Sequence, residues 1–366
     1  MKRIAILLAV VLVLPCLLFS CSGEKYETVM EYNGVKLTEN MYYYWMSTFK
    51  RNILSSYSDA KDDASFWQAK YDENQTVEEY FTEIINQRIM NYLIAQSIFR
   101  EQKLTLSSDE KKAIKNDIKE KIEYYGSRGE LNKELKNLML NIDSLETIYT
   151  WEKRHDAVYD YFYGKNGTET VSDSQIIDYY EKNYSRIKYI VFYTTKIKTD
   201  DKGNYVYDSD GQLVTEEMTE EELAATKKKI EKCNEKLNNG ASFDDMIKEY
   251  SDYNKIKEYP NGFYVSANEI STWGSGIVSG AVTAKPGDVF RVDEEAAVYL
   301  VLKCELTPFD SLSDTDSDQL KNLASYATTG LYREKFSALS EKVKVSGEIL
   351  SKYRLSEIKA NPYYSF

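Results

Sequence analysis

Two short apolar stretches that alternate like β-strands enclose a segment with helical patterns, Arg186–Glu305. The first stretch is Arg186–Phe192 and the second is Ala297–Cys304. Between them lie helical patterns and the turn 259–264, which reads Tyr-Pro-Asn-Gly-Phe-Tyr. Strand patterns at both ends of such a segment predict a mixed α and β module. The chain before and after it is mostly helical in pattern, and we expect it to frame the module.

The N-terminus predicts a secretory signal peptide that covers residues 1–20. Two basic residues, Lys2 and Arg3, precede the apolar run Ile4–Phe19. Pro15 interrupts this run, which is shorter than the about 20 apolar residues that a membrane-spanning helix needs. A basic start followed by a short apolar run is typical of a cleaved signal.

The end of this signal resembles a bacterial lipobox. It reads Leu-Phe-Ser-Cys over residues 18–21, with a small residue just before the cysteine. The resemblance implies that Cys21 carries lipid as the first residue of the mature protein. Residues 21–28 would then form a polar tether on the extracytoplasmic face of a bacterial cell membrane. The alternative is an ordinary cleaved signal in which the cysteine occurs by chance.

The composition is that of a globular, acidic protein. The chain has 366 residues, of which 29% are charged and 13% aromatic, with 32 tyrosines. This length suggests two or three domains. Loss of the signal would lower the 47 basic residues to 45 against 59 acidic ones, a formal charge of −14. Such a surface repels phosphate, so we expect no nucleic-acid partner, and the lipid would have to provide the attachment to the membrane.

Cysteine and histidine are too few for a disulfide framework or a Cys/His metal site. Beyond the signal and its lipidation site only Cys233 and Cys304 remain; they could pair, but we expect both as reduced packing residues. The chain's one histidine, His155, is expected at the surface. The acidic run Asp314–Asp318 lacks the glycine and glutamate of a calcium loop and is interpreted as a solvated helix N-terminus. We find no cofactor motif and expect neither cofactor nor metal.

Residues 29–170 predict a helical domain that begins with a β-hairpin. Asn33–Gly34 separates two alternating segments, which is a strong hairpin signal. Capping boxes at Thr76 and Ser107 each predict a helix start. A long aromatic-rich helix is expected from about Ser144 to Tyr163. The helix after the first capping box carries an apolar residue every four positions, at Val77, Phe81, Ile85, Ile89 and Leu93.

Residues 171–307 predict the α and β module itself. A β-hairpin insert is expected at about 200–216, with its turn at Asp208–Gly211. A long helix over 219–237 and a short helix over 242–251 follow.

Five segments of this module resemble, in order and spacing, the parvulin-type peptidyl-prolyl isomerases of PrsA- and SurA-type foldases. The start of the chain likewise resembles SurA-type chaperone domains. The resemblance implies an α+β fold, in which a mostly helical SurA-N-like domain contains an inserted parvulin-like module. Residues 308–366 would supply a helix, from about Asp316 to Val343, and a tail that return to the helical domain. The five segments are Lys188–Phe192, Asn239–Asp252, Asn261–Tyr264, Lys285–Val289 and Val298–Glu305.

The module departs from the parvulin pattern where that family carries its histidines. The first histidine position holds Tyr189, and the last holds Tyr299, or Leu300 if the register slips by one. The family's polar Cys or Asp position falls near Tyr253. Tyrosine hydroxyls can donate and accept hydrogen bonds, but the loss of both imidazoles indicates a relaxed demand for catalysis. No catalytic residue is assigned beyond these degenerate positions.

Apolar residues at the positions of the family's proline pocket predict a substrate groove. The alternative is that these side chains are ordinary core, because aromatic residues pack well in any interior. The groove residues are Phe263, Tyr264, Ile270 and Trp273.

Together these patterns predict a lipid-anchored extracytoplasmic foldase or chaperone that binds unfolded or partly folded secreted polypeptides. One alternative is a peptidyl-prolyl isomerase of low efficiency. That reaction needs no nucleophile and only has to lower a rotation barrier of about 18–20 kcal/mol. A second alternative is a surface lipoprotein with a structural or ligand-binding role. The sequence names no client and leaves homodimerisation open.

Overall fold

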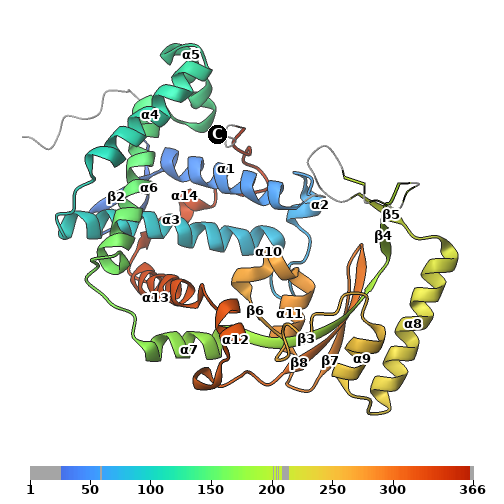
Figure 1. The fold of residues 1–366 in the computed structure, drawn as a ribbon. Coiled ribbons are helices and arrows are strands. Elements are labelled where there is room, and N and C mark those ends of the chain that lie inside the picture. The colour runs from blue at the N-terminus through green and yellow to red at the C-terminus, as the bar shows by residue number, and fades with distance from the viewer. Residues whose placement is uncertain are drawn as a thin grey trace, which may run out of the picture. The chain divides into compact units, whose positions relative to one another are not determined.

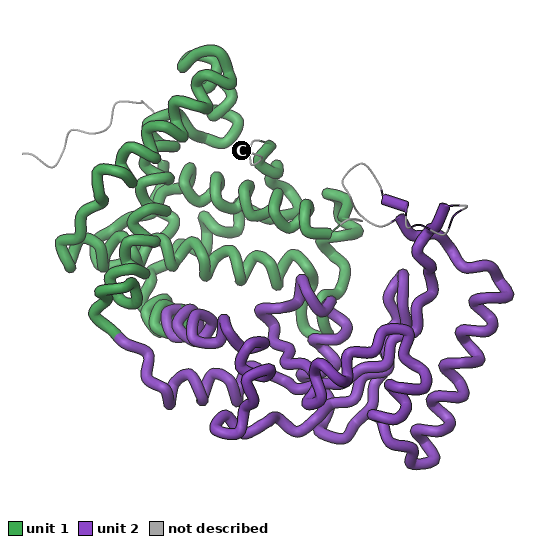
Figure 2. The backbone as a smooth tube through the Cα atoms, in the orientation of Figure 1, with its two compact units in different colours: residues 1–169, 333–366 green, residues 170–332 purple. Residues whose placement is uncertain are grey.

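The computed structural model describes residues 26–57, 60–200, 202, 204, 206, 207 and 214–362. The predicted signal peptide, Cys21 and the turn at 208–211 lie outside these residues. The chain divides into two compact units (Figure 2). Unit 1 comprises residues 1–169 and 333–366, and unit 2 comprises residues 170–332. Within the described ranges, no helix combines the length and apolarity that crossing a bilayer would take.

Unit 1 is mostly helical and begins with the predicted hairpin. Asn33 and Gly34 adopt φ angles of 47° and 76°, the left-handed conformation that a two-residue hairpin turn requires. The hairpin is therefore confirmed. A third strand from near the end of the chain, β9 (Lys344–Val345), pairs with β1, so the sheet order is β2-β1-β9. The earlier elements are β1 (Thr28–Tyr32), β2 (Val35–Thr38), α1 (Glu39–Ser56), α2 (Ala64–Trp67), α3 (Val77–Glu101), α4 (Ser108–Tyr124), α5 (Arg128–Leu135) and α6 (Ile142–Tyr163).

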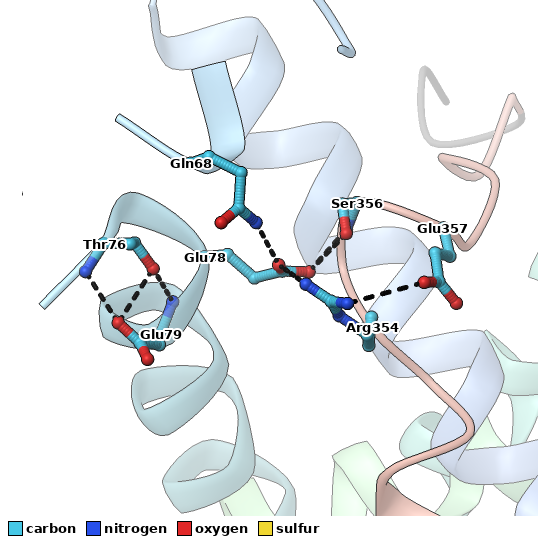
Figure 3. Close-up of polar contacts among 7 residues, drawn as sticks. All are labelled: Gln68, Thr76, Glu78, Glu79, Arg354, Ser356 and Glu357. Carbon is cyan, nitrogen blue, oxygen red and sulfur yellow. Dashed lines mark hydrogen bonds and ion pairs between the residues drawn. The ribbon is translucent and has the colours of Figure 1, made fainter. Parts of the chain in front are cut away.

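The capping boxes predicted for unit 1 are confirmed at the starts of α3 and α4. At the first of them, the Thr76 amide donates to Glu79 Oε2 at 2.8 Å, and the Glu79 amide donates back to Thr76 Oγ1 at 3.2 Å (Figure 3). The aromatic-rich helix begins two residues before the predicted Ser144. The Asn141 side chain caps it by accepting from the Ser144 amide at 2.8 Å.

The buried carboxylate of Glu78 holds the C-terminal tail against α3 (Figure 3). It accepts from the amide and the hydroxyl of Ser356, at 2.8 and 2.7 Å, and from Arg354 Nη2 at 2.9 Å. Gln68 Nε2 donates to it as well, at 2.9 Å. Burial raises the pKa of Glu78, but the hydrogen bonds from Ser356 and Arg354 outweigh it and leave the pKa below its ordinary value.

A buried lysine on α1 makes a second attachment to the same tail. The Lys50 side chain is 1% exposed, and its ammonium donates to the Ile358 carbonyl at 2.7 Å. Asp62 neutralises this ammonium at 2.6 Å. Further along the tail, the Asn361 amide donates to the Ser47 carbonyl at 2.9 Å. Ile358 and Asn361 are thus part of the interior of unit 1.

Unit 2 contains a four-stranded antiparallel sheet of order β6-β3-β8-β7 (Figure 1). With the helices that cover it, this confirms the α+β fold class. A separate antiparallel pair, β4 with β5, forms the base of the predicted insert. The elements are α7 (Asp173–Asn183), β3 (Tyr184–Tyr193), β4 (Thr195–Ile197), β5 (Thr215–Glu217), α8 (Glu220–Asn238), α9 (Phe243–Tyr250), β6 (Phe263–Ser266), α10 (Ile270–Trp273), α11 (Ser275–Thr283), β7 (Val289–Asp293) and β8 (Ala297–Cys304).

The two faces of this sheet have different covers because side chains alternate along a strand. Ile190, Phe192 and Leu300 face α8 and α9, where the buried Cys233 also packs. Ile187 and Val301 face the other way, with the α11 residues Ile277 and Ala281. Both described cysteines, Cys233 and Cys304, are free, as predicted, and burial raises the pKa of the Cys233 thiol to about 11.

The helix predicted from Asp316 to Val343 is two helices, α12 (Asp314–Gln319) and α13 (Leu323–Ser340). Leu320 closes the first one, and both Leu320 and Leu323 are buried in one cluster. The solvated N-terminus predicted here is wrong at Asp316, which is 1% exposed. Its carboxylate accepts from Asn261 Nδ2 at 2.9 Å, so it ties α12 to the turn before β6.

His155, predicted at the surface, is only partly exposed. Its ring lies 5.3 Å from that of Tyr92 and 6.1 Å from that of Phe336, and only 25% of its side chain is exposed. The histidine therefore packs within unit 1.

Candidate functional site

Five half-exposed aromatic side chains meet on the α11 face of the unit 2 sheet. The Tyr189 ring centroid lies 5.3 Å from Phe263, 6.2 Å from Trp273 and 5.9 Å from Tyr299. Phe263 also contacts Trp273 at 5.3 Å and Tyr259 at 4.8 Å. We call these five residues the aromatic cluster.

Strand register brings the two tyrosines of the cluster together. Val191 on β3 pairs with Tyr299 on β8, and Tyr189 pairs with Val301. Tyr189 and Tyr299 are therefore diagonal neighbours on one face, within reach of each other's rings. Leu300 points to the opposite face and is buried there, so Tyr299 is the residue that shares a surface with Tyr189.

A tight turn sets Phe263 beside Tyr189. Gly262 has a φ of +92°, and its backbone passes so close to the Ile187 carbonyl that no Cβ would fit. Ile187 then pairs with Phe263 in the β3–β6 ladder. Trp273 at the end of α10 packs against the rings of Tyr189 and Phe263. The cluster is thus positioned by four elements, β3, β6, β8 and α10, and by the turn before β6.

The structure places the remaining predicted site residues differently. Tyr264 lies on the opposite face of β6, is 3% exposed, and donates its hydroxyl to Thr307 Oγ1 at 2.7 Å. Ile270, on α10, is 49% exposed. Tyr253 is 45% exposed and borders a small pocket next to Tyr189. Tyr259 belongs to the cluster although sequence reasoning did not select it; an aromatic residue directly before the Pro-Asn-Gly turn was the available signal.

The small pocket next to Tyr189 is apolar and phenolic in character. Two lysines line it, but each is paired: Lys188 Nζ lies 2.7 Å from Asp244, and Lys255 Nζ lies 2.6 Å from Glu258. With its cations neutralised, the pocket suits an uncharged side chain better than an anion. It is lined by Lys188, Tyr189, Ile247, Tyr253, Lys255, Ile256, Tyr259, Gly262 and Phe263.

The site contains neutral phenols and no imidazole. Burial, reinforced by the nearby phenols of Tyr253 and Tyr299, raises the pKa of Tyr189 to about 12. Burial also raises the pKa of Tyr299. The chain's single histidine lies in unit 1. In the part of the chain that the structure describes, no cluster of His, Cys, Asp and Glu side chains could hold a metal ion. The arrangement offers aromatic faces and hydroxyl groups, which bind apolar chains, and no general base that titrates near neutral pH.

Comparisons with known proteins found solved structures only. No protein-family profile and no curated protein matches the chain. It is similar to PrsA from Bacillus subtilis (16% identity, 78% of this chain and 93% of that one, TM-score 0.24) and to the foldase protein PrsA from Streptococcus pneumoniae (15%, 79% and 97%, 0.25). It is also similar to the foldase protein PrsA from Lactococcus lactis (11%, 89% and 98%, 0.26).

Proposed function

We propose that the chain is an extracytoplasmic, lipid-anchored chaperone of the foldase type, which holds unfolded or partly folded secreted polypeptides on the aromatic cluster. The proposal rests on the half-exposed aromatic rings that lie together on the antiparallel sheet of unit 2, a unit whose sequence contains no histidine. Burying apolar surface of a client there contributes roughly 25 cal/mol per Å². Tyrosine and tryptophan lose few rotors on binding, which suits reversible contact with many sequences.

The cluster is preorganised, which lowers the entropic cost of binding. The strand of Tyr189, β3, pairs on one side with β6, which carries Phe263, and on the other side with β8, which carries Tyr299. Trp273 contacts two of these aromatic residues.

A slow peptidyl-prolyl isomerase is the second candidate, and the contact between the Tyr189 and Tyr299 rings favours it. Their hydroxyls could contact the amide of a bound proline.

Trp273→Ala is expected to weaken the binding of an unfolded client by about tenfold, because an aromatic anchor contributes on the order of 1–2 kcal/mol. Binding and suppression of client aggregation are measured with a denatured, carboxymethylated protein. Tyr124→Ala, which removes an exposed aromatic side chain in unit 1, is the control and should have no effect. Thermal melts verify that both variants are folded.

The same preparations separate the two candidates in a proline-limited refolding assay. The chaperone should suppress aggregation without accelerating refolding. Acceleration that disappears in the Tyr189→Phe/Tyr299→Phe double variant would establish the isomerase instead. If the wild-type chain neither binds the client nor accelerates refolding, both candidates fail and a structural or ligand-binding role is left.

Cys21→Ser is expected to release the protein from the membrane fraction of the producing cells. The variant lacks the thiol that lipid would modify, and the described helices provide no span. Fractionation followed by immunoblotting measures the release, with Cys233→Ser as the control that should stay with the membrane. Retention of Cys21→Ser on the membrane would contradict the lipid anchor.

A further inference from the structure

A second cavity, of about 350 Å³, lies within unit 1 between the end of α3, the first half of α4 and the middle of α6. Its apolar walls include Phe99, Leu106 and Ile114, which are 7%, 7% and 3% exposed. The volume is in the range of small-ligand sites, about 300–1,000 Å³. None of its lining residues belongs to the aromatic cluster.

A half-buried cation borders these apolar walls. The Arg154 guanidinium lies 5.1 Å from the Phe99 ring centroid, and its Nη1 donates to Gln96 Oε1 at 3.2 Å. Its Nε is buried and has no hydrogen-bond partner among the described residues. Burial lowers the pKa of Arg154, and none of the ion pairs between described residues includes it; the nearby Asp156 pairs with Lys153 and His155. The Arg154 guanidinium thus lines the cavity without a neutralising carboxylate among the described residues.

Two further cations line the cavity from α4. Lys111 and Lys115 are exposed, stand one turn apart, and take part in no ion pair within the described ranges. Like charges at this spacing on a helix repel each other. Glu146 is the cavity's one carboxylate, so the lining has an excess of two positive charges in a chain whose net charge is −12. An anion bound in the cavity would offset this excess of positive charge.

We propose that this cavity binds the carboxyl-terminal end of a polypeptide whose last side chain is bulky and apolar. The terminal carboxylate contacts Arg154, Lys111 and Lys115, and the side chain enters between Phe99 and Ile114. A terminal residue carries both groups on one carbon atom, which matches cations placed beside apolar walls. The volume of about 350 Å³ suits one or two residues better than a long acyl chain. This inference is independent of the function proposed for the aromatic cluster.

Fluorescence anisotropy with two labelled peptides tests the proposal on the full chain. The probes are fluorescein-Gly-Gly-Ser-Leu-Phe with a free carboxylate and the same peptide with a terminal amide. We expect the acid to bind at least tenfold more tightly than the amide and to lose affinity as salt is raised. Lys111→Gln/Lys115→Gln should weaken binding of the acid about tenfold. The control Lys112→Gln/Lys119→Gln removes the same charge from α4 away from the cavity and should bind normally.

Each other outcome overturns the inference. If the acid and the amide bind with equal affinity, the cavity does not recognise the carboxylate. The same follows if the two double-lysine variants lose equal affinity for the acid. Loss of probe binding in Trp273→Ala would place the probe on the aromatic cluster instead. Displacement of the probe by decanoate at lower concentrations than by unlabelled peptide would assign the cavity to fatty carboxylates. Because the lysines are exposed, these tests do not depend on replacing the packed Arg154.

Discussion

Gly262→Ala is expected to destabilise unit 2 by about 3 kcal/mol or more, whereas Gly287→Ala should cost only about 1–2 kcal/mol. The two glycines have nearly the same φ angle, +92° and +93°, so a side chain at either position carries the cost of a positive φ. The two positions differ in the free space around the glycine. A Cβ at position 262 would overlap the Ile187 carbonyl and approach Lys188 Cγ to 2.9 Å, while nothing lies within 4 Å at position 287.

The added cost at position 262 arises because the neighbouring strand cannot move aside. Ile187 is paired on both sides, with Phe263 on β6 and with Lys303 on β8. Urea unfolding of both variants, followed by circular dichroism, measures the difference. The client-binding assay should also respond to Gly262→Ala, because Phe263 follows the turn directly. Equal costs for the two substitutions would show that the backbone relaxes and that the close approach to Ile187 is unimportant.

Glu78→Gln is expected to loosen the C-terminal tail and lower the free energy of unfolding of unit 1 by about 2–3 kcal/mol. A hydrogen bond to a charged group contributes about 1.5–3 kcal/mol, and the amide can replace only part of the set that Glu78 makes with Ser356. The bond to Arg354 adds little, because that side chain is 52% exposed. Glu357→Gln is the matched control, since it contacts the same arginine at 3.6 Å from an exposed position (Figure 3). It should change stability by less than about 0.5 kcal/mol.

The effect of Glu78 should also depend on pH in one direction. Its pKa is lowered in the folded protein, so its contribution is complete above the ordinary glutamate pKa of 4.5. That contribution is lost as the pH falls through the lower, folded value. The stability difference between wild type and Glu78→Gln should therefore be constant from pH 7 to 5 and shrink below pH 4.5. A difference that persists unchanged at pH 3 would contradict the assigned role of the carboxylate.

The sequence predicted those features that depend on residues a few positions apart. The hairpin at Asn33–Gly34 and the capping boxes at Thr76 and Ser107 were correct, because each is determined by local backbone and side-chain bonds. The strand patterns that became β3 and β8 were also recognised. Helix α11 was missed because it contains glycines, which normally indicate a break. Its Gly280 lies against the Phe290 ring, so close packing on β7 explains the residue.

The candidate site was predicted only in part, because its geometry depends on contacts between distant residues. The positions of the family's proline pocket predicted both Phe263 and Tyr264 as groove residues. Side chains alternate along β6, so the two lie on opposite faces of the sheet, and only Phe263 belongs to the aromatic cluster. The burial of Asp316 follows from its bond to Asn261, 55 residues away. Strand order and the pairing between β3 and β6 decide such contacts, and no local pattern in the chain encodes them.

Unit 1 is built from the two ends of the chain, and this has a consequence for the order in which it can fold during synthesis. The ribosome synthesises the third strand, β9, only after all of unit 2. The same holds for the tail that forms hydrogen bonds with Glu78 and Lys50. At roughly 5–20 residues per second, the intervening residues 170–332 take on the order of ten to thirty seconds to appear. Throughout that interval one edge of β1 is unpaired and the carboxylate of Glu78 lacks its tail partners. Docking of the tail therefore comes after synthesis of unit 2, and it requires a chain synthesised through residue 361.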